Sequence, residues 1–327
     1  MSSLIQEISS PIIDDIKIFN KFFKENLNSS NVKLINSVIN YLCKTKGKQF
    51  RVVLCLLCSR LTNKKPNELT YLSASTSEIL HVATLLHDDI VDDSDIRRGW
   101  PTINKIWKNK ISILVGDYMF SKALINITEL NDFKSIKILA EISKRLSEGE
   151  ISQIEHALNK NMDEKKYFKM ISDKTASLIS AACYLGFYST NKDEKLGLSV
   201  KRFGEYLGIA YQLKDDIFDI VGNINNTGKK TNLDLKKNML TLPYIYSISQ
   251  MDNKDKKGFL LQIRKSKSKI NINRIKKVIT TNGGIDYSEK KILEYSNKAK
   301  EELDNFQDSI FKDSLIKAID FNVSRKY

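Results

Sequence analysis

No proline occurs between Pro101 and Pro243. Proline removes a backbone hydrogen bond from a helix, and glycine destabilises helix interiors, yet the 327 residues include only 4 Pro and 13 Gly. Apolar residues recur at helical spacing, as with Ile12, Ile16 and Phe19, and no segment alternates as a strand does. We therefore predict an all-α fold built from long helices.

Polar runs and the few breakers divide the predicted helices. We expect helices over residues 10–43, 68–94 and 142–158, and one from residue 103 onward. After a loop over 159–164, a further helix should run to residue 188. Another helix should follow the polar run 190–194. The Gly- and Asn-rich run 222–230 has loop composition, and a helix should begin at Thr241-Leu242-Pro243, with proline in its first turn.

The formal net charge is +14, which is compatible with nucleic-acid binding. The lysines are scattered through loops, however, and aromatic residues do not interleave with them as a platform for single strands requires. We predict no nucleic-acid partner, and we expect the charge to favour anionic substrates or a membrane surface.

Two further sequence features indicate the cellular compartment of the protein. The N-terminus lacks a basic segment followed by an apolar core, and the longest apolar run, Val52–Cys58, is far too short to cross a bilayer. We expect a soluble, cytoplasmic protein. Cys55 and Cys58 form a C-x-x-C inside that apolar run without a second pair at zinc spacing, so we expect reduced thiols that pack in the core.

The stretch from Leu85 to Gly99 places five carboxylates and two guanidinium groups directly after an apolar helical run. On a helix, His81, Thr84, Asp88, Asp92 and Asp95 fall on one stripe roughly 80° wide. Carboxylates stacked at this spacing repel each other, so the helix favours a bound cation. Hard oxygen ligands suit Mg²⁺ held by one or two carboxylates and a substrate phosphate.

A second helical face repeats this arrangement at positions i, i+3, i+4 and i+7, with Gln212, Asp215, Asp216 and Asp219. Leu213, Ile217 and Ile220 lie on a separate, apolar stripe. One acidic face alone is usually solvated surface. Two Asp-Asp-x-x-Asp faces in apolar helices, each with basic or amide groups nearby, instead predict two walls of one metal–diphosphate site.

These motifs closely resemble those of the trans-polyprenyl diphosphate synthases. The matching segments are His81 to Asp92 with Arg97-Arg98-Gly99, Gly116-Asp117, Lys174-Thr175-Ala176, Gln212 to Asp219, and Leu242-Pro243. Within that family the chain looks most like the bacterial octaprenyl diphosphate synthases. The resemblance implies an isoprenoid-synthase bundle of long helices around a central cavity, as a single domain over residues 1–327.

The resemblance also implies a reaction. An allylic diphosphate ionises, the double bond of isopentenyl diphosphate attacks the carbocation head-to-tail, and a proton leaves. The family pattern places Mg²⁺ on Asp88, Asp92 and Asp215, and it makes Asp89, Asp216 and Asp219 secondary ligands or orienting groups. The side chains that would complete the clamp on the allylic diphosphate are Arg97, Lys174, Thr175, Gln212 and Lys229.

By the same resemblance, isopentenyl diphosphate has its own metal-free basic pocket, formed by Gly47, Lys48, Arg51, His81 and Arg98. Arginine suits bidentate contact with phosphate. Taken alone, His81 would be interpreted as a core histidine, and Arg97 and Arg98 as caps on a helix C-terminus. Their place beside the acidic stripe favours substrate binding instead.

The chain departs from the family pattern in two regions. Lys46 and Val52 stand where the family usually has glycine and proline, and Asn232–Leu235 and Met239-Leu240 replace a Gly-Asp-Asp-Leu run and a Gly-Lys pair. One lysine that binds diphosphate is therefore missing, or it is replaced by Lys236 or Lys237. The departures affect turnover and lid closure rather than the class of reaction.

Ala83 and Thr84, five and four positions before Asp88, are small. In the family, large residues there stop the product at a short chain, so the resemblance implies a long product near eight isoprene units, suited to a quinone side chain. The alternatives are a shorter farnesyl or geranylgeranyl synthase and a non-catalytic subunit of a heteromeric synthase. A terpene cyclase fits less well, because it usually carries an Asn/Ser/Glu triad in place of the second motif. We expect a homodimer with transient membrane-surface contact during product release.

Overall fold

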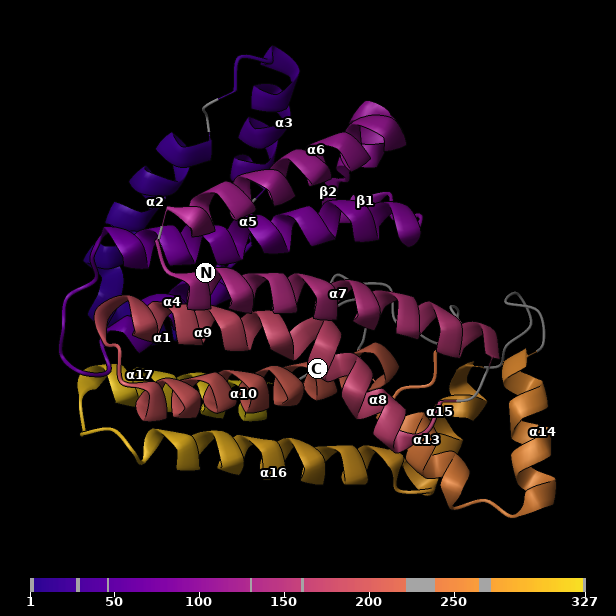
Figure 1. Ribbon diagram of the computed structural model, residues 1–327. Coiled ribbons are helices and arrows are strands. Elements are labelled where there is room, and N and C mark those ends of the chain that lie inside the picture. Colours follow the sequence, from indigo (N-terminus) through magenta and orange to yellow (C-terminus); the bar gives the residue numbers. More distant parts are fainter. Residues whose placement is uncertain are drawn as a thin grey trace. The chain divides into compact units, whose positions relative to one another are not determined.

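The computed structural model describes residues 3–27, 30–45, 47–129, 131–159, 162–221, 239–264 and 272–325, and these are helical apart from short connections and one small hairpin (Figure 1). The prediction of an all-α fold is confirmed. Within the described residues, no helix combines the length and the apolar character needed to cross a membrane.

Packing divides the chain into two compact units, which are described separately. Unit 1 comprises residues 1–141, 178–204 and 302–318, and unit 2 comprises residues 142–177, 205–301 and 319–327. The helices α7 (Phe133–Asn159), α10 (Glu194–Val221) and α17 (Ile310–Ser324) contribute residues to both units. A single continuous domain stays a prediction.

Unit 1 begins with short helices and then forms two long ones. Its elements are α1 (Ser3–Ser9), η1 (Ser10–Ile12), α2 (Ile13–Leu27), α3 (Lys33–Lys44), α4 (Phe50–Ser59), α5 (Glu68–Val91), β1 (Ile96–Arg97), β2 (Trp100–Pro101), α6 (Ile103–Thr128) and most of α9 (Ser177–Thr190). Figure 1 shows α5 and α6 side by side. Asn67 caps α5, since its side chain accepts from the Thr70 N–H while the Thr70 hydroxyl accepts from the Asn67 N–H.

The core of unit 1 is built around α4, which is buried on every face from Val52 to Ser59. The predicted core role of its cysteines is confirmed: Cys55 and Cys58 are fully buried with Cys183 of α9, and none of the four thiols forms a disulfide. Burial raises the pKa of Cys55 and Cys58, which keeps these thiols protonated.

Two predicted helix boundaries in unit 1 are wrong. The single helix expected over 10–43 is interrupted, since α3 starts at Lys33 after Ser30, whose Oγ accepts from the Val32 N–H and whose carbonyl accepts from Asn36. Such local polar bonds compete with helix formation. The helix expected over 68–94 ends at Val91, because the chain turns through Asp93 with φ 48°.

Unit 2 contains the second acidic motif. Its own elements are α8 (Glu164–Ile171), the π-helical turn η2 (Ser172–Ala176), α13 (Leu242–Ser249), α14 (Asn253–Arg264), α15 (Ile272–Thr281) and most of α16 (Gly284–Leu303). The apolar stripe predicted on α10 is confirmed, with Leu213, Ile217 and Ile220 packed into the core of this unit. Helix α13 begins as expected, with proline in its first turn. The loop predicted over 222–230 lies outside the described residues.

Candidate active site

The last turn of α5 carries the first acidic motif. Asp88 lies inside the helix and Asp92 caps its end, with the Asp92 N–H donating to the Asp88 carbonyl at 2.8 Å. Both side chains are half-buried. The helix therefore ends within the motif, and Asp95, which we predicted on the same stripe, is exposed in the segment beyond it and pairs with Lys105.

Asp89 is held by a neighbouring arginine. The Arg97 Nε and Nη2 atoms lie 2.8 and 2.7 Å from Oδ1 of Asp89, whose side chain is almost fully buried. Burial raises the pKa of Asp89, and the hydrogen bond from Arg97 partly opposes this rise. This carboxylate fits the orienting role that the resemblance implied.

A two-residue hairpin positions the paired arginines. Strand β1 pairs with β2 in antiparallel register, with Ile96 opposite Pro101 and Arg97 opposite Trp100. The two residues of the turn, Arg98 and Gly99, both have positive φ, 54° and 81°. This conformation matches the twist of a tight hairpin, but it is unusual for a residue with a side chain. We predicted that the helix ends before this turn, but we did not predict the hairpin itself.

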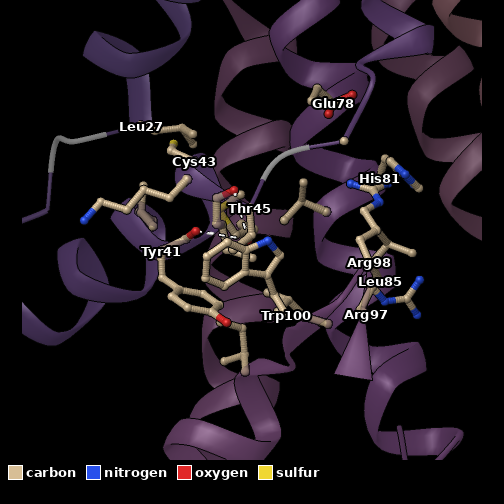
Figure 2. Close-up of a pocket in the computed structure, with 18 of the residues that line it drawn as sticks. Leu27, Tyr41, Cys43, Thr45, Glu78, His81, Leu85, Arg97, Arg98 and Trp100 are labelled. Atoms are coloured by element: carbon tan, nitrogen blue, oxygen red, sulfur yellow. Dashed lines mark hydrogen bonds between the residues drawn. The ribbon is translucent and has the colours of Figure 1, made fainter. Parts of the chain in front are cut away.

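Beside the arginines lies a cavity of about 370 Å³ within unit 1, which we call the basic cavity (Figure 2). Apolar side chains such as Leu85 line part of it, and its polar lining includes Gly47, Glu78, His81, Asp89, Arg97 and Arg98. A side chain at position 47 would collide with the Arg98 guanidinium, so glycine there lets this group pack against the backbone. The structure thus gathers four of the residues that we predicted to bind diphosphate.

His81 is neutral in this environment. Burial lowers the pKa of the imidazole well below its usual value, and the charges of Arg51, Arg98 and Arg97 lower it further. Arg51, in the first turn of α4, is therefore close enough to act on His81, whereas Lys48 is exposed on the preceding loop. A neutral imidazole among arginines can exchange hydrogen bonds with a diphosphate without competing for its charge.

The second acidic motif, on α10, is hydrogen-bonded within unit 2. Both oxygens of the buried Asp216 are engaged, one by the Tyr167 hydroxyl at 2.5 Å and the other by the Gln212 amide at 2.7 Å. Asp215 accepts from the Arg325 Nη2 atom at 2.8 Å, and this guanidinium lies over the Tyr211 ring.

Lys174 and Thr175 lie on the π-helical turn. The Lys174 Nζ atom is 2.8 Å from the Gln153 Oε1 atom and 2.5 Å from the Glu150 Oε2 atom, both on α7. The Thr175 hydroxyl donates to Gln212 at 2.8 Å, which links the turn to the second acidic motif. Single π-helical turns within α-helices are frequent at functional sites. Lys229 lies outside the described residues.

The carboxylates of both motifs are hard oxygen donors suited to Mg²⁺. Among the described residues, however, no group of three His, Cys, Asp or Glu side chains is gathered for a metal. The donor chemistry fits a divalent ion, whose remaining ligands would be supplied by diphosphate and water. Asp88 and Asp92 belong to unit 1 and Asp215 to unit 2, so a shared cluster stays a prediction.

Comparisons with known proteins decide the family. The polyprenyl synthetase model matches residues 32–281. This chain belongs to the polyprenyl synthetase family. It is therefore a prenyltransferase, as its motifs predicted.

Several relatives illustrate the similarity. The octaprenyl diphosphate synthase of Haemophilus influenzae is 30% identical over 99% of this chain and 97% of its own length. The heptaprenyl diphosphate synthase component 2 of Bacillus subtilis is 34% identical over 72% of this chain and 67% of its own length. A crystal structure of polyprenyl synthase from Caulobacter crescentus CB15, complexed with calcium and isoprenyl diphosphate, has a TM-score of 0.90 and 29% identity and covers 99% of this chain and 98% of that one.

For this polyprenyl synthetase, sequence reasoning missed the partners of the predicted residues. These partners are Glu150 and Gln153 beside Lys174, Tyr167 beside Asp216, and Arg325 beside Asp215. The spacing of Glu150 and Gln153, which follow Gly149, could have indicated these partners of Lys174, because an acid and an amide one turn apart share a helix face. Arg325 lies 110 residues from its partner, so no local pattern could have indicated that contact.

Proposed function

We propose that this prenyltransferase condenses isopentenyl diphosphate head-to-tail with an allylic diphosphate and makes a long all-trans polyprenyl diphosphate in the cytoplasm. The observation that carries the proposal is the basic cavity, where Gly47, His81, Arg97 and Arg98 converge within unit 1 beside the first acidic motif. Its polar side offers cations and a neutral imidazole, and its apolar side offers space for a short hydrocarbon.

In this proposal the basic cavity holds isopentenyl diphosphate. Arg98 and Arg51 neutralise the diphosphate, and His81 adds a hydrogen bond without an additional charge. The five-carbon tail lies against apolar side chains such as Leu85. This substrate must not ionise, which agrees with a pocket whose lining contains more cationic side chains (Lys24, Lys44, Arg97 and Arg98) than carboxylates (Glu78 and Asp89).

The acidic motifs bind the other substrate. Asp88, Asp92 and Asp215 would hold Mg²⁺, which when bound would neutralise the negative charge of the diphosphate that leaves the allylic carbon. Lys174 and Thr175 would contact the same diphosphate, with Gln212, Arg97 and Lys229 as further contacts. Asp89 and Asp216, which are almost fully buried as well as hydrogen-bonded to protein side chains, would orient the motifs rather than bind the metal.

We further propose a product near eight isoprene units, suited to a quinone side chain. Ala83 and Thr84 are small, and relatives include octaprenyl and heptaprenyl synthases, so the support is for a long product. The assembly proposed is a homodimer, because α6 exposes an apolar stripe formed by Ile113, Leu114, Leu124 and Ile125. The component 2 relative makes a heteromer the alternative.

One incubation tests the reaction. Purified protein is mixed with labelled isopentenyl diphosphate and an allylic primer, with Mg²⁺ or with a chelator, and the dephosphorylated products are sized by chromatography. We expect metal-dependent incorporation and a product near eight units. Absence of any product with every primer would contradict the proposal, and a product of three or four units would contradict its chain-length part alone.

A further inference from the structure

The π-helical turn Ser172–Ala176 is enclosed by helices on two sides. A Cβ atom on Gly149 of α7 would lie 2.8 Å from the Lys174 backbone nitrogen, and one on Gly208 of α10 would lie 2.8 Å from the Ala176 Cβ atom. Real Cβ atoms do not approach that closely, so two glycines allow two helices to touch the backbone of the turn. A turn held this closely has little freedom to rotate.

An ionic network centred on the buried Asp173 side chain also holds this turn. Arg145 of α7 donates through Nε to Asp173 at 2.7 Å and through Nη2 to Ser172 and Glu205, each at 2.8 Å. The Ser172 hydroxyl also bonds to Glu205, and Lys169 lies 2.5 Å from Asp173. The Asp173 side chain is only 5% exposed, which strengthens these bonds relative to surface ion pairs.

The network touches none of the groups that we assign to substrate. Asp173 directly precedes Lys174, whose ammonium contacts Gln153 and Glu150. The next residue, Thr175, donates a hydrogen bond to Gln212. Because the turn is helical, a rotation that moved the Asp173 side chain would also move the two side chains that follow it.

We propose that Arg145, Asp173 and Glu205 are positioning residues that set the orientation of Lys174 and Thr175 toward the allylic diphosphate. The inference rests on the proposed role of Lys174. The guanidinium spans two carboxylates and a hydroxyl with its fixed fork, and a lysine at 145 could reach only part of this set.

The test compares Arg145→Gln, Arg145→Lys and Asp173→Asn with a matched control, Arg202→Gln. Arg202 makes an ion pair with Glu302 that belongs to unit 1. The readouts are the Kd of an allylic thiolodiphosphate that cannot ionise, the KM of each substrate, and thermal unfolding. We expect Arg145→Gln and Asp173→Asn to weaken the allylic analogue roughly tenfold to a hundredfold, with the KM for isopentenyl diphosphate unchanged. Arg145→Lys should give an intermediate loss, and Arg202→Gln none.

A double variant separates positioning from mere destabilisation. If Arg145 acts through Lys174, Arg145→Gln combined with Lys174→Ala should bind the analogue no more weakly than Lys174→Ala alone. Additive losses, or equal increases in both KM values, would overturn the inference. If Lys174→Ala itself left allylic binding unchanged, the proposed role of Lys174 would fail, and the inference with it. If Lys174→Ala weakened binding and Arg145→Gln did not, the inference alone would fail.

Discussion

At the scale of single residues, neighbouring carboxylates differ in burial in the same way in both aspartate motifs. The middle members, Asp89 and Asp216, are almost fully buried and hydrogen-bonded to Arg97 and Tyr167. The first members, Asp88 and Asp215, are only half-buried at the surface of their helices. Burial with a fixed partner suits a group that orients its helix, and partial exposure suits a group that binds an incoming ion.

Replacing the half-buried carboxylates should stop turnover without unfolding the protein. We expect Asp88→Ala and Asp215→Ala each to lower kcat by about a hundredfold or more, since electrostatic groups at the reacting centre contribute on this scale. Asp95→Ala is the matched control, because Asp95 belongs to the same acidic stretch but is exposed and pairs with Lys105. Initial rates and circular dichroism measure both effects, and near-normal turnover of either variant in Mg²⁺ would contradict the predicted metal ligands.

His81 should make stability depend on pH. Its pKa is lower in the folded protein than in the unfolded chain, so the unfolded chain binds more protons as the pH falls below about 6.5. Above that pH, the neutral imidazole makes its full contribution to the free energy of unfolding. Between the unfolded and the folded pKa values of His81, this free energy falls by up to about 1.4 kcal/mol for each pH unit of acidification. Urea unfolding at pH 7.5 and pH 5 should show a larger loss for the native chain than for His81→Gln. Equal losses would mean that His81 is not kept neutral.

At the scale of elements, the close glycine contact between α7 and the π-helical turn should be measurable. Gly149→Ala places a methyl group 2.8 Å from the Lys174 nitrogen, so we expect overpacking to cost about 1–3 kcal/mol. Gly258, inside α14, has open space around its Cβ position, and Gly258→Ala should instead stabilise by about 0.5–1 kcal/mol. Opposite signs in urea unfolding are the expected result, and a neutral Gly149→Ala would show that α7 can move away.

The buried face of α5 should set the product length. Ala83 is 1% exposed, and a tyrosine there would fill space that we expect the growing tail to need. Ala83→Tyr should still consume both substrates but stop at three or four isoprene units, at a stability cost of about 1–3 kcal/mol. Product sizing and thermal unfolding together test this. A folded, active variant that kept the parent's long product would show that this face does not line the tail's path.

Sequence predicted the elements whose signals are local and missed those that depend on distant contacts. The helix beginning at Leu242 was predictable because proline fixes its first turn, and the core stripe of α10 followed from spacing alone. The break before α3 depends on which bonds Ser30 makes, and a hairpin with two-residue strands is too short for alternation to show. Among site residues, Asp88 and His81 were found from spacing and motif resemblance, whereas Arg145 had no local signal.

At the scale of the whole molecule, the excess of positive charge affects which molecules the protein attracts, and the exposed apolar stripe of α6 affects how it assembles. A net charge of +14 attracts diphosphate substrates and anionic surfaces over a Debye length, about 8 Å at physiological salt. The apolar stripe instead favours a second protein surface, because exposed apolar groups of this extent are usually covered.

A charge placed in that stripe should dissociate the proposed homodimer. Leu114, 63% exposed on α6, lies inside the stripe, while Leu198, 50% exposed on α10, lies outside it. We expect Leu114→Glu to sediment as a monomer and Leu198→Glu to keep the assembly of the native chain. A native chain that is monomeric at micromolar concentration would contradict the dimer.

The hairpin turn also determines how this chain responds to selection. Arg98 adopts a left-handed backbone conformation that costs a residue with a side chain of order 1–3 kcal/mol, whereas glycine would adopt it freely. The same residue supplies a guanidinium to the basic cavity. Laboratory evolution for heat tolerance alone should therefore replace Arg98 early, and evolution for product yield should retain it at the expense of stability.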